Sequence, residues 1–371
     1  MVGVYVRAAG LRARMGQSVR SRPTLRVGVV VRVELFRQEK EITQIVPGWT
    51  RLAKRGSAGV FSSPAWALSA WKWLPQLGAP LLVSVFDRET LVGILALTIE
   101  ERRTGTIVRC AGTPLGDRYD ALVRPESKRE AMVGILTGLR NCLADGGTAA
   151  LSELDPRGYL ALSLTSHRFA AARRGLRIER RTSEPSPWVH LPTHDRVDTL
   201  WSASRLKSWR NRWRWLANRG RVAVTRVNGP AEIATEVPEF VRRRLGFWAE
   251  RGKLELLPDV ERAPQFPSFL AEACSALASH GGCFLTHLTV NDNPIASDLY
   301  FRVPGVDILY MRSFDPAWAA GSPGHLLFAE TARTSSLENV RAVELGRGDE
   351  PYKRQIGGVM GKLLDVVVTA D

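Results

Sequence analysis

Apolar runs of strand length alternate with stretches of helical spacing along most of the chain. Strand-like runs in the first half occupy 27–35, 81–86, 91–99 and 106–110. A polar turn at 87–90 joins the second run to the third as a hairpin. Between the first two runs, Trp66, Ala70 and Trp73 share one helical face behind Pro64, which suits a first helical turn. A helix at 127–144, a strand at 149–154, a helical stretch reaching Gly175 and a closing strand at 188–191 complete this half.

The second half repeats this plan. A helix over 203–219 begins at Ser202 or Ser204 as its cap and ends at Gly220. A strand at 222–227 is followed by helices at 231–251 and 267–280. Three strands at 283–290, 295–303 and 306–314 then form an antiparallel meander with short turns. A helix at 324–337 and strands at 342–345 and 363–368 end the chain.

The order strand, helices, meander, helix, strand, strand resembles that of a GNAT acyltransferase domain. This resemblance implies an α/β (α+β) protein with tandem GNAT-like domains, each a mixed, mostly antiparallel sheet flanked by helices. Three prolines between 185 and 192 indicate a boundary. We expect a basic N-terminal extension at 1–32, an N-terminal GNAT-like domain at 33–195 and a C-terminal acyltransferase domain at 196–371. Fold alone does not decide function.

The excess positive charge of the chain is concentrated in two segments. The 371 residues carry 52 Lys and Arg against 37 Asp and Glu, a formal charge of +15. Residues 1–33 contain seven arginines and no acid, and residues 199–231 contain eight basic residues and no acid. These two segments account for the whole excess, so the rest of the chain is balanced. We expect the first segment to be disordered, since Arg-rich, acid-free tails rarely fold. A transit peptide or a start codon placed too far upstream are alternatives.

Composition excludes several classes of protein. The 44% hydrophobic content is that of a globular chain with a sizeable core. No run reaches the roughly 18–20 apolar residues of a membrane span, and no secretory signal is recognisable. The four cysteines lack zinc-site spacing, so we expect neither a metal site nor a disulfide framework. The sequence favours a cytoplasmic protein.

The helix at 203–219 combines tryptophans with arginines. Leu206, Trp209 and Trp213 share an apolar face, which predicts packing on a core. Trp215 lies on the opposite side, either packed under the other domain or exposed for stacking on a base or sugar. Arg210 and Arg214 belong to a separate stripe that can hold phosphates or remain a solvated surface.

Candidate chemistry gathers around the meander and the segments after it. Gly321, Ser322, Gly324 and His325 open the helix at 324–337, where backbone N–H groups and the helix dipole favour a phosphate. Asp315 precedes them as a turn opener or a substrate contact. Within the meander, His287 and Asp298 are mid-strand polar residues that either pack or act as a base. After the strand at 342–345, a glycine-flanked loop carries the densest group of polar residues: Arg347, Asp349, Tyr352 and Lys353.

These segments resemble a known family. The run LGRGDEPYKRQIG is similar to the terminal signature of GNAT acetyltransferases of the CelD, or cellulose-biosynthesis, type, which are related to the Fem-type aminoacyl transferases. The runs SRLKSWRNRWRWLANRG, FDPAWAAGSPGHLLFAE and FSSPAWALSAW resemble further segments of that family, in the same order over about residues 34–365. One departure matters: against the pyrophosphate loop Arg/Gln-x-x-Gly-x-Gly/Ala, this chain has Trp318 and Pro323 at the first and last positions.

The resemblance implies an acyltransferase that moves an acyl group from acetyl-CoA or another acyl-CoA to an amine or hydroxyl of a small molecule or saccharide. It also implies a role in exopolysaccharide or cell-envelope synthesis, with the polysaccharide machinery as a partner. An aminoacyl-tRNA-dependent transferase and a non-catalytic partner of that machinery are the alternatives. For an enzyme, we expect Asp349 first, then Asp298 or His287, as the base. Tyr352 would protonate the leaving group, and Lys353 would hold a phosphate or carboxylate.

Overall fold

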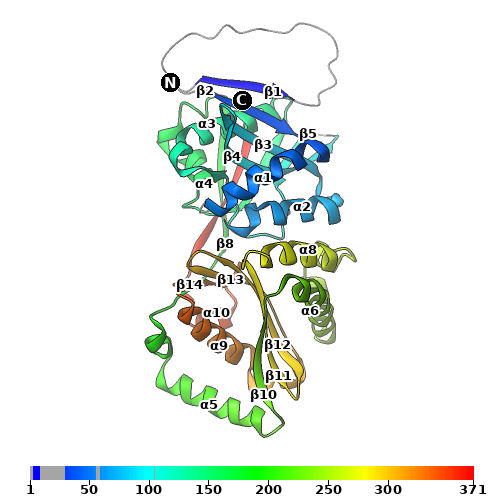
Figure 1. Ribbon diagram of the computed structural model, residues 1–371, viewed down its shortest axis with the longest axis vertical. Coiled ribbons are helices and arrows are strands. Elements are labelled where there is room, and N and C mark those ends of the chain that lie inside the picture. Colours follow the sequence, from blue (N-terminus) through cyan, green and yellow to red (C-terminus); the bar gives the residue numbers. More distant parts are fainter. Residues whose placement is uncertain (1–2, 9–29, 56–58, 104) are drawn as a thin grey trace. The chain divides into compact units, whose positions relative to one another are not determined.

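The computed structural model describes residues 3–8, 30–55, 59–103 and 105–371 (Figure 1). Most of the expected N-terminal extension therefore lies outside the described residues. Within it, Gly3–Ala8 forms strand β1, which pairs in parallel with β2 at Val30–Phe36. The chain divides into two compact units, 1–183 with 363–371, and 184–362.

The first unit is built on one mixed sheet with the strand order β1-β2-β3-β4-β5-β7-β15-β8, and β6 pairs with β4. Its strands are β3 (Ala79–Asp87), β4 (Thr90–Arg102), β5 (Gly105–Cys110), β6 (Leu122–Val123), β7 (Thr148–Leu154), β8 (Leu176–Pro185) and β15 (Lys362–Ala370). Its helices are α1 (Glu39–Arg55), α2 (Pro64–Trp73), α3 (Lys128–Leu143) and α4 (Tyr159–Thr165).

Helices cover both faces of this first sheet. Trp49 of α1 and Trp71 of α2 pack with the strand residues Leu82 and Phe86 in one core cluster. On the opposite face α3 lies close to the strands, and a Cβ at Gly138 would come within 2.4 Å of Val83. Glycine is therefore required where α3 crosses the sheet.

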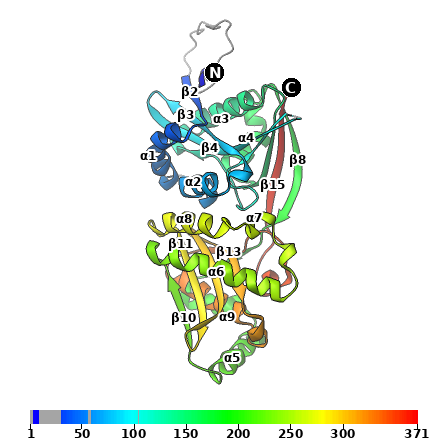
Figure 2. The ribbon, with the colours of Figure 1, turned by 90° about the vertical axis from the view of Figure 1, so that its right-hand side faces the viewer.

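The second unit is built on the sheet β10-β11-β12-β13-β14-β9. Its strands are β9 (Trp188–His190), β10 (Val222–Val227), β11 (Cys283–Val290), β12 (Asn293–Val303), β13 (Val306–Phe314) and β14 (Ala342–Glu344). Its helices are α5 (Ala203–Ala217), α6 (Pro230–Glu250), α7 (Asp259–Arg262), α8 (Phe266–Ala278), α9 (Pro323–Leu337) and α10 (Pro351–Gln355). Helices α6 and α8 lie over one face of the sheet and α9 over the other (Figure 2).

The fold class is confirmed, because both units are mixed sheets flanked by helices. Two strands, however, lie in sheets other than those expected. The strand at 188–190 was expected to close the first half, but it pairs with β14 in the second sheet. The last strand, β15, was expected in the second half, but it pairs with β7 in the first sheet. The division between the units therefore falls between Ser183 and Glu184 instead of near 195, and the chain returns to the first unit at Leu363.

Candidate functional site

The second sheet opens between β13 and β14. These parallel strands pair only from Val306 with Ala342 to Ile308 with Glu344, and β13 continues to Phe314 without β14. A register shift against β12 leaves Tyr310 as an extra residue in β13. Such a bulge bends a strand and ends regular pairing. The residues of β13 beyond Ile308 therefore have an edge that β14 does not cover.

Backbone donors line this open edge. The carbonyl of Arg312 accepts a hydrogen bond from Arg244 at 3.5 Å, and the carbonyl of Phe314 accepts one from Arg251 at 3.2 Å. Asp315 N donates to Ile295 O at 3.0 Å, so the backbone groups of Asp315 point toward the β12 side. In an antiparallel pair this direction alternates along the strand, so the carbonyls of Phe314 and Arg312 point away from β12. The N–H group of a strand residue points to the same edge as its carbonyl. The N–H groups of Arg312 and Phe314 therefore face the opening.

A buried ion pair crosses the sheet beside the opening. Asp298 is fully buried in β12, and its two carboxylate oxygens accept hydrogen bonds from Arg312 Nε and Nη2 at 2.8 and 2.6 Å. Burial acts to lower the pKa of Arg312, but the charge and hydrogen bonds of Asp298, with Tyr352 and Tyr300, together raise it. Asp298 was a candidate base, but both of its oxygens are engaged. This geometry is typical of a structural ion pair.

Tyr352 of α10 lies next to this ion pair. The Arg312 guanidinium carbon is 5.3 Å from the centre of the Tyr352 ring. Burial raises the pKa of Tyr352 to about 12, although the nearby Arg312 opposes this shift. The phenol is therefore protonated at neutral pH and can donate a hydrogen bond to a group at the opening.

A pocket of about 430 Å³ lies where α5, α9 and α10 meet. Its lining is polar and cationic: Ser202, Ser204, Arg205, Ser208, Trp209, Arg212, Ser322, His325 and Gln355. The helix N-termini of α5 and α9 both contribute residues to the lining, and each carries a positive partial charge. This combination of two helix N-termini, two guanidiniums and several hydroxyls is that of an anion site.

The charges in the pocket are only partly neutralised. Arg205 donates to the carbonyl of Gln355, whereas no hydrogen bond or ion pair joins Arg212 to any other described residue. Burial lowers the pKa of His325 to about 4, and Arg312, Arg212 and Arg205 add to the shift. The imidazole is thus neutral at pH 7, and the net charge of the lining is positive.

One side of the loop before α9 packs against α5. Trp318 makes an edge-to-face contact with Trp215 of α5, with ring centres 6.1 Å apart. Gly321 is buried, and a Cβ there would lie 3.0 Å from Leu216 and 3.1 Å from the Trp215 ring. Neither expectation for Trp215 holds, because it packs against this loop within its own unit. Its ring is covered by Arg219, whose guanidinium carbon is 3.6 Å from the ring centre.

Of the four residues predicted for cofactor binding, only Ser322 and His325 line the pocket. Gly324 is buried against the side chain of Arg312. Asp315 caps the 3-10 turn Pro316–Gly321 by accepting a hydrogen bond from Ala317 N at 2.8 Å. The Asp315 carboxylate is therefore used to cap this turn.

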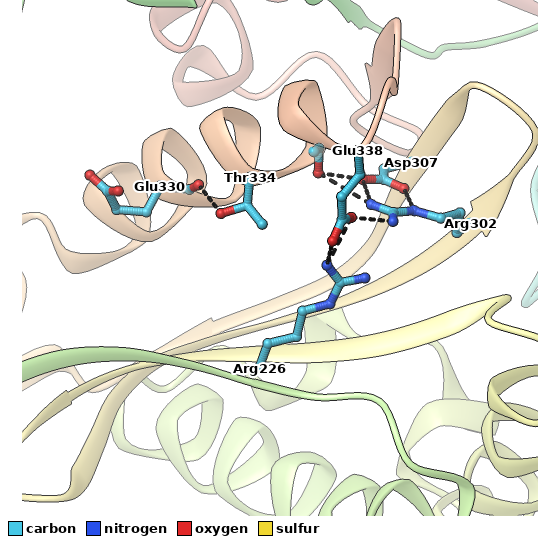
Figure 3. A network of polar contacts seen from close by, with 7 residues as sticks. Arg226, Arg302, Asp307, Glu330, Thr334 and Glu338 are labelled. Atoms are coloured by element: carbon cyan, nitrogen blue, oxygen red, sulfur yellow. Dashed lines mark hydrogen bonds and ion pairs between the residues drawn. The ribbon is translucent and has the colours of Figure 1, made fainter. Parts of the chain in front are cut away.

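An ion network anchors the far end of α9 (Figure 3). Arg302 binds both oxygens of Asp307 at 2.6 and 2.7 Å and also contacts Glu338, which follows α9. Arg226 of β10 binds the same Glu338 at 2.7 and 2.9 Å. Ser335 of α9 donates to Asp307. These contacts fix α9 against the sheet and so fix the position of its N-terminus in the pocket.

The loop after β14 is organised from inside by Lys353. Its Nζ is buried and donates to the carbonyls of Gly346, Arg347 and Gly348, and it lies 2.9 Å from Glu350. Lys353 was expected to hold a phosphate or carboxylate, but its three donors are used within the protein. Arg347, another of the polar residues singled out in this loop and a candidate for binding the substrate, is half-buried and contributes its carbonyl to this arrangement.

The other predicted residues of this region face solvent. Asp349, the first candidate for the base, is exposed and forms an ion pair with Arg354 at 3.3 Å. Arg210 and Arg214 are exposed on α5, on a side that does not line the pocket. Arg214 makes a hydrogen bond with Asn211 at 3.4 Å.

His287 belongs to a polar row on the face of the sheet that α6 covers. Its Nδ1 is 2.7 Å from Ser297 Oγ, and its Nε2 is 4.0 Å from Glu236 of α6. Burial lowers the pKa of His287 to about 4, and the charge of Arg243 adds to this. Ser297 is the register partner of both His287 and Ser313 of β13.

Several residues of the site were missed by sequence analysis. Arg205 and Arg212 were counted only as part of a basic segment, although their spacing of seven places them on one helix face. Arg312 and Ser297 gave no signal, since their importance comes from cross-strand neighbours. A cluster of three or more potential metal ligands is absent from the described residues. None of the helices described here is long and apolar enough to span a membrane.

Comparisons with known proteins bear on the fold and on the second unit. Residues 203–354 match the family model of the acetyltransferase (GNAT) domain. The fold is similar to that of FemX, with a TM-score of 0.59, 10% identity, and coverage of 86% of this chain and 95% of that one. It is also similar to the C-terminal DUF2156 domain of an Agrobacterium fabrum protein assigned as a lysylphosphatidylglycerol synthetase, with a TM-score of 0.54, 12% identity, and coverage of 89% and 93%. No curated protein matches the chain.

Proposed function

We propose that the second unit transfers an acyl group from an acyl-CoA to an amine or hydroxyl. The observation that carries this proposal is the anion pocket at the N-terminus of α9, on a GNAT domain whose sheet opens between β13 and β14. An acyl-CoA molecule would place its thioester at the opening of the sheet and its phosphates in the pocket, so a single donor would occupy both.

The pocket residues fit the phosphates of such a donor. Arg205 and Arg212 supply two guanidiniums, and Ser322 and His325 stand at the start of α9. The volume lies within the range of about 300–1,000 Å³ that is usual for small-molecule sites. The loop departs from the usual pyrophosphate sequence at Trp318 and Pro323. In our proposal the α5 arginines supply the positive charge that the loop lacks.

The open edge would polarise the reacting carbonyl. The N–H groups of Arg312 and Phe314 face the opening and can donate to the oxygen that becomes negative as the acceptor attacks. The acceptor nitrogen or oxygen forms a bond to the carbonyl carbon, and the carbon–sulfur bond then breaks. The electron pair of that bond leaves on sulfur.

Tyr352 would stabilise the departing sulfur. A thiol has a pKa of roughly 8.5, well below the value of about 12 for this phenol. Tyr352 therefore donates a hydrogen bond to the thiolate and keeps its proton, and the thiolate takes a proton from solvent after release. This replaces the full proton transfer expected from the sequence.

The acceptor class rests on the resemblance to the CelD type. We propose a small molecule or saccharide that carries an amine or hydroxyl, in exopolysaccharide or cell-envelope synthesis. The exposed Lys207, Arg210 and Arg214 of α5 favour a second candidate, an aminoacyl-tRNA-dependent transferase, because a cationic helix surface attracts nucleic acid.

The test is release of free thiol from acetyl-CoA by the purified chain, with panels of amino sugars, sugars and amino acids as acceptors. We expect acceptor-dependent thiol release that follows Michaelis–Menten kinetics. Arg212→Gln should raise KM for acetyl-CoA about 10–100-fold, which corresponds to the loss of one charged hydrogen bond of ~1.5–3 kcal/mol. Arg210→Gln removes the same charge outside the pocket and should leave KM unchanged. Equal effects of the two substitutions would contradict the assignment of the pocket.

A further inference from the structure

Three side chains on neighbouring strands connect a buried imidazole to the open edge of the sheet. In register order they are His287 of β11, Ser297 of β12 and Ser313 of β13. Side chains of directly paired residues stand on the same face with Cβ atoms about 4.5–5.5 Å apart. All three are at most 6% exposed, so the row is buried.

Of the two hydrogen bonds that would join this row, the one between His287 and Ser297 is present and the one between Ser297 and Ser313 is not. His287 Nδ1 and Ser297 Oγ are 2.7 Å apart, a normal hydrogen-bond distance. Ser313 Oγ is buried and has no hydrogen-bond partner among the described residues. Ser313 Oγ makes no hydrogen bond to Ser297 in the structure, so this link requires rotation of the Ser313 side chain about its Cα–Cβ bond. In that rotamer the hydroxyl donates to Ser297 and accepts from a group at the opening. A buried hydroxyl without a partner costs stability and calls for an explanation.

The end of the row coincides with the proposed reaction site. Ser313 lies between Arg312 and Phe314, the two residues whose N–H groups face the opening. Its side chain projects to the α6 face, opposite to Arg312, because neighbouring side chains of a strand alternate. An acceptor that approaches the carbonyl from the α6 face therefore meets this hydroxyl.

We propose that His287, Ser297 and Ser313 form a proton relay that accepts the proton of the attacking amine or hydroxyl. This inference rests on the proposed acyl transfer. Ser313 Oγ takes the proton of the acceptor and passes its own to Ser297 Oγ, which passes its own to His287 Nδ1. The electron pair of the acceptor forms the new bond to the carbonyl carbon. His287 then returns its proton to solvent, where the released thiolate is reprotonated.

Two charged side chains of α6, Glu236 and Arg243, face His287 with opposite effects. Glu236 is 4.0 Å from Nε2 and stabilises the imidazolium once it forms. Arg243 opposes that charge and is itself near Glu236. In this relay Ser313 is the catalytic residue, whereas Ser297 and His287 act through it.

The experiment is a double-mutant cycle on turnover with acetyl-CoA. His287→Gln and Ser313→Ala should each lower kcat by the roughly 10²–10⁴-fold that general-base catalysis contributes, and leave KM for acetyl-CoA unchanged. Because either change breaks the same relay, the double variant should be no slower than the slower single variant. Ser313→Thr keeps a hydroxyl and should retain most of the activity. Ser84→Ala removes another buried, partnerless hydroxyl, in the first unit, and should have no effect.

Two further readouts separate the possible failures. In nitrogen-detected NMR of the six histidines, His287 should carry its proton on Nε2, and Ser297→Ala should shift only its Nδ1 resonance. If the wild-type chain turns over but the losses of the two single variants add in the double variant, the relay is overturned and the acyl transfer stands. Full activity of Ser313→Ala would lead to the same conclusion. A wild-type chain that binds no CoA and releases no thiol would overturn both.

Discussion

Asp298 and Arg312 face each other on β12 and β13 and form a two-pronged ion pair with distances of 2.8 and 2.6 Å. Asp298 is fully buried, and the Arg312 side chain is 13% exposed. The pair stands directly beside the opening of the sheet, with the Tyr352 ring centre 5.3 Å from the guanidinium carbon. A Cβ at Gly324 would lie 3.5 Å from Cδ of Arg312. The ion pair therefore holds in place the strand whose N–H groups would donate to the reacting carbonyl.

Asp298→Ala should destabilise the protein strongly. Removing one partner of a buried pair leaves the other charge without compensation, which costs about 3–5 kcal/mol. Urea unfolding of the second unit measures this loss. The double variant Asp298→Ala with Arg312→Met should recover part of it, because the stranded charge is then gone. A single variant as stable as wild type would show that the pair is open to water.

Asp349→Asn should leave both turnover and stability nearly unchanged. The carboxylate is exposed, and an exposed ion pair such as that with Arg354 contributes about 0–1 kcal/mol. Steady-state kinetics with acetyl-CoA tests this. A drop in kcat of a hundredfold or more, with KM intact, would return Asp349 to the role of base that the sequence suggested.

Lys353→Met should loosen the loop after β14. It leaves the carbonyls of Gly346, Arg347 and Gly348 without their buried donor, and we expect a loss of about 2–3 kcal/mol. Thermal unfolding measures the loss, with the exposed Lys362→Met as the control. If Lys353→Met instead kept full stability and weakened CoA binding alone, the ammonium would be a ligand contact.

Stability should fall in mild acid because of His287. Its pKa is about 4 in the folded chain and 6.5 in an unfolded peptide, so the unfolded state binds more protons between these values. Stability is therefore lost as pH falls from 6.5 toward 4, by up to about 3 kcal/mol at 1.36 kcal/mol per unit. Urea unfolding at several pH values should show a shallower decline in His287→Gln. If the free energy of unfolding fell equally with pH in the wild type and in His287→Gln, His287 would not be a buried, neutral imidazole.

Local patterns in the sequence were sufficient to find most elements of the second unit. The strands expected at 222–227, 283–290 and 306–314 match β10, β11 and β13, because short turns with glycine, asparagine or proline bound them. Ser202 caps α5 as expected, accepting from Arg205 N. Helix α1 was missed, since Pro47 and Gly48 interrupt it, although Ile42, Trp49 and Leu52 are spaced for one buried face.

Features that depend on distant pairing were not predictable in this way. Strand character at 188–190 and 362–370 was visible, but which sheet receives each strand is decided by partners far away in sequence. The same holds for the site. The hydrogen bonds of Lys353 to backbone carbonyls, the pairing of Asp298 with Arg312 and the row from His287 to Ser313 all follow from register and loop geometry, which composition does not encode.

Binding of CoA to the purified chain distinguishes an acyl-CoA-dependent transferase from the alternatives. We expect CoA to raise the free energy of unfolding of wild type and Arg210→Gln by about 2.7 kcal/mol at 100 times its Kd. Arg212→Gln should show a much smaller rise at the same concentration. If neither CoA nor acetyl-CoA stabilises the wild-type chain while tRNA does, the donor assignment is contradicted and the aminoacyl-tRNA reaction takes its place. If none of the three stabilises it, the second unit is a non-catalytic partner.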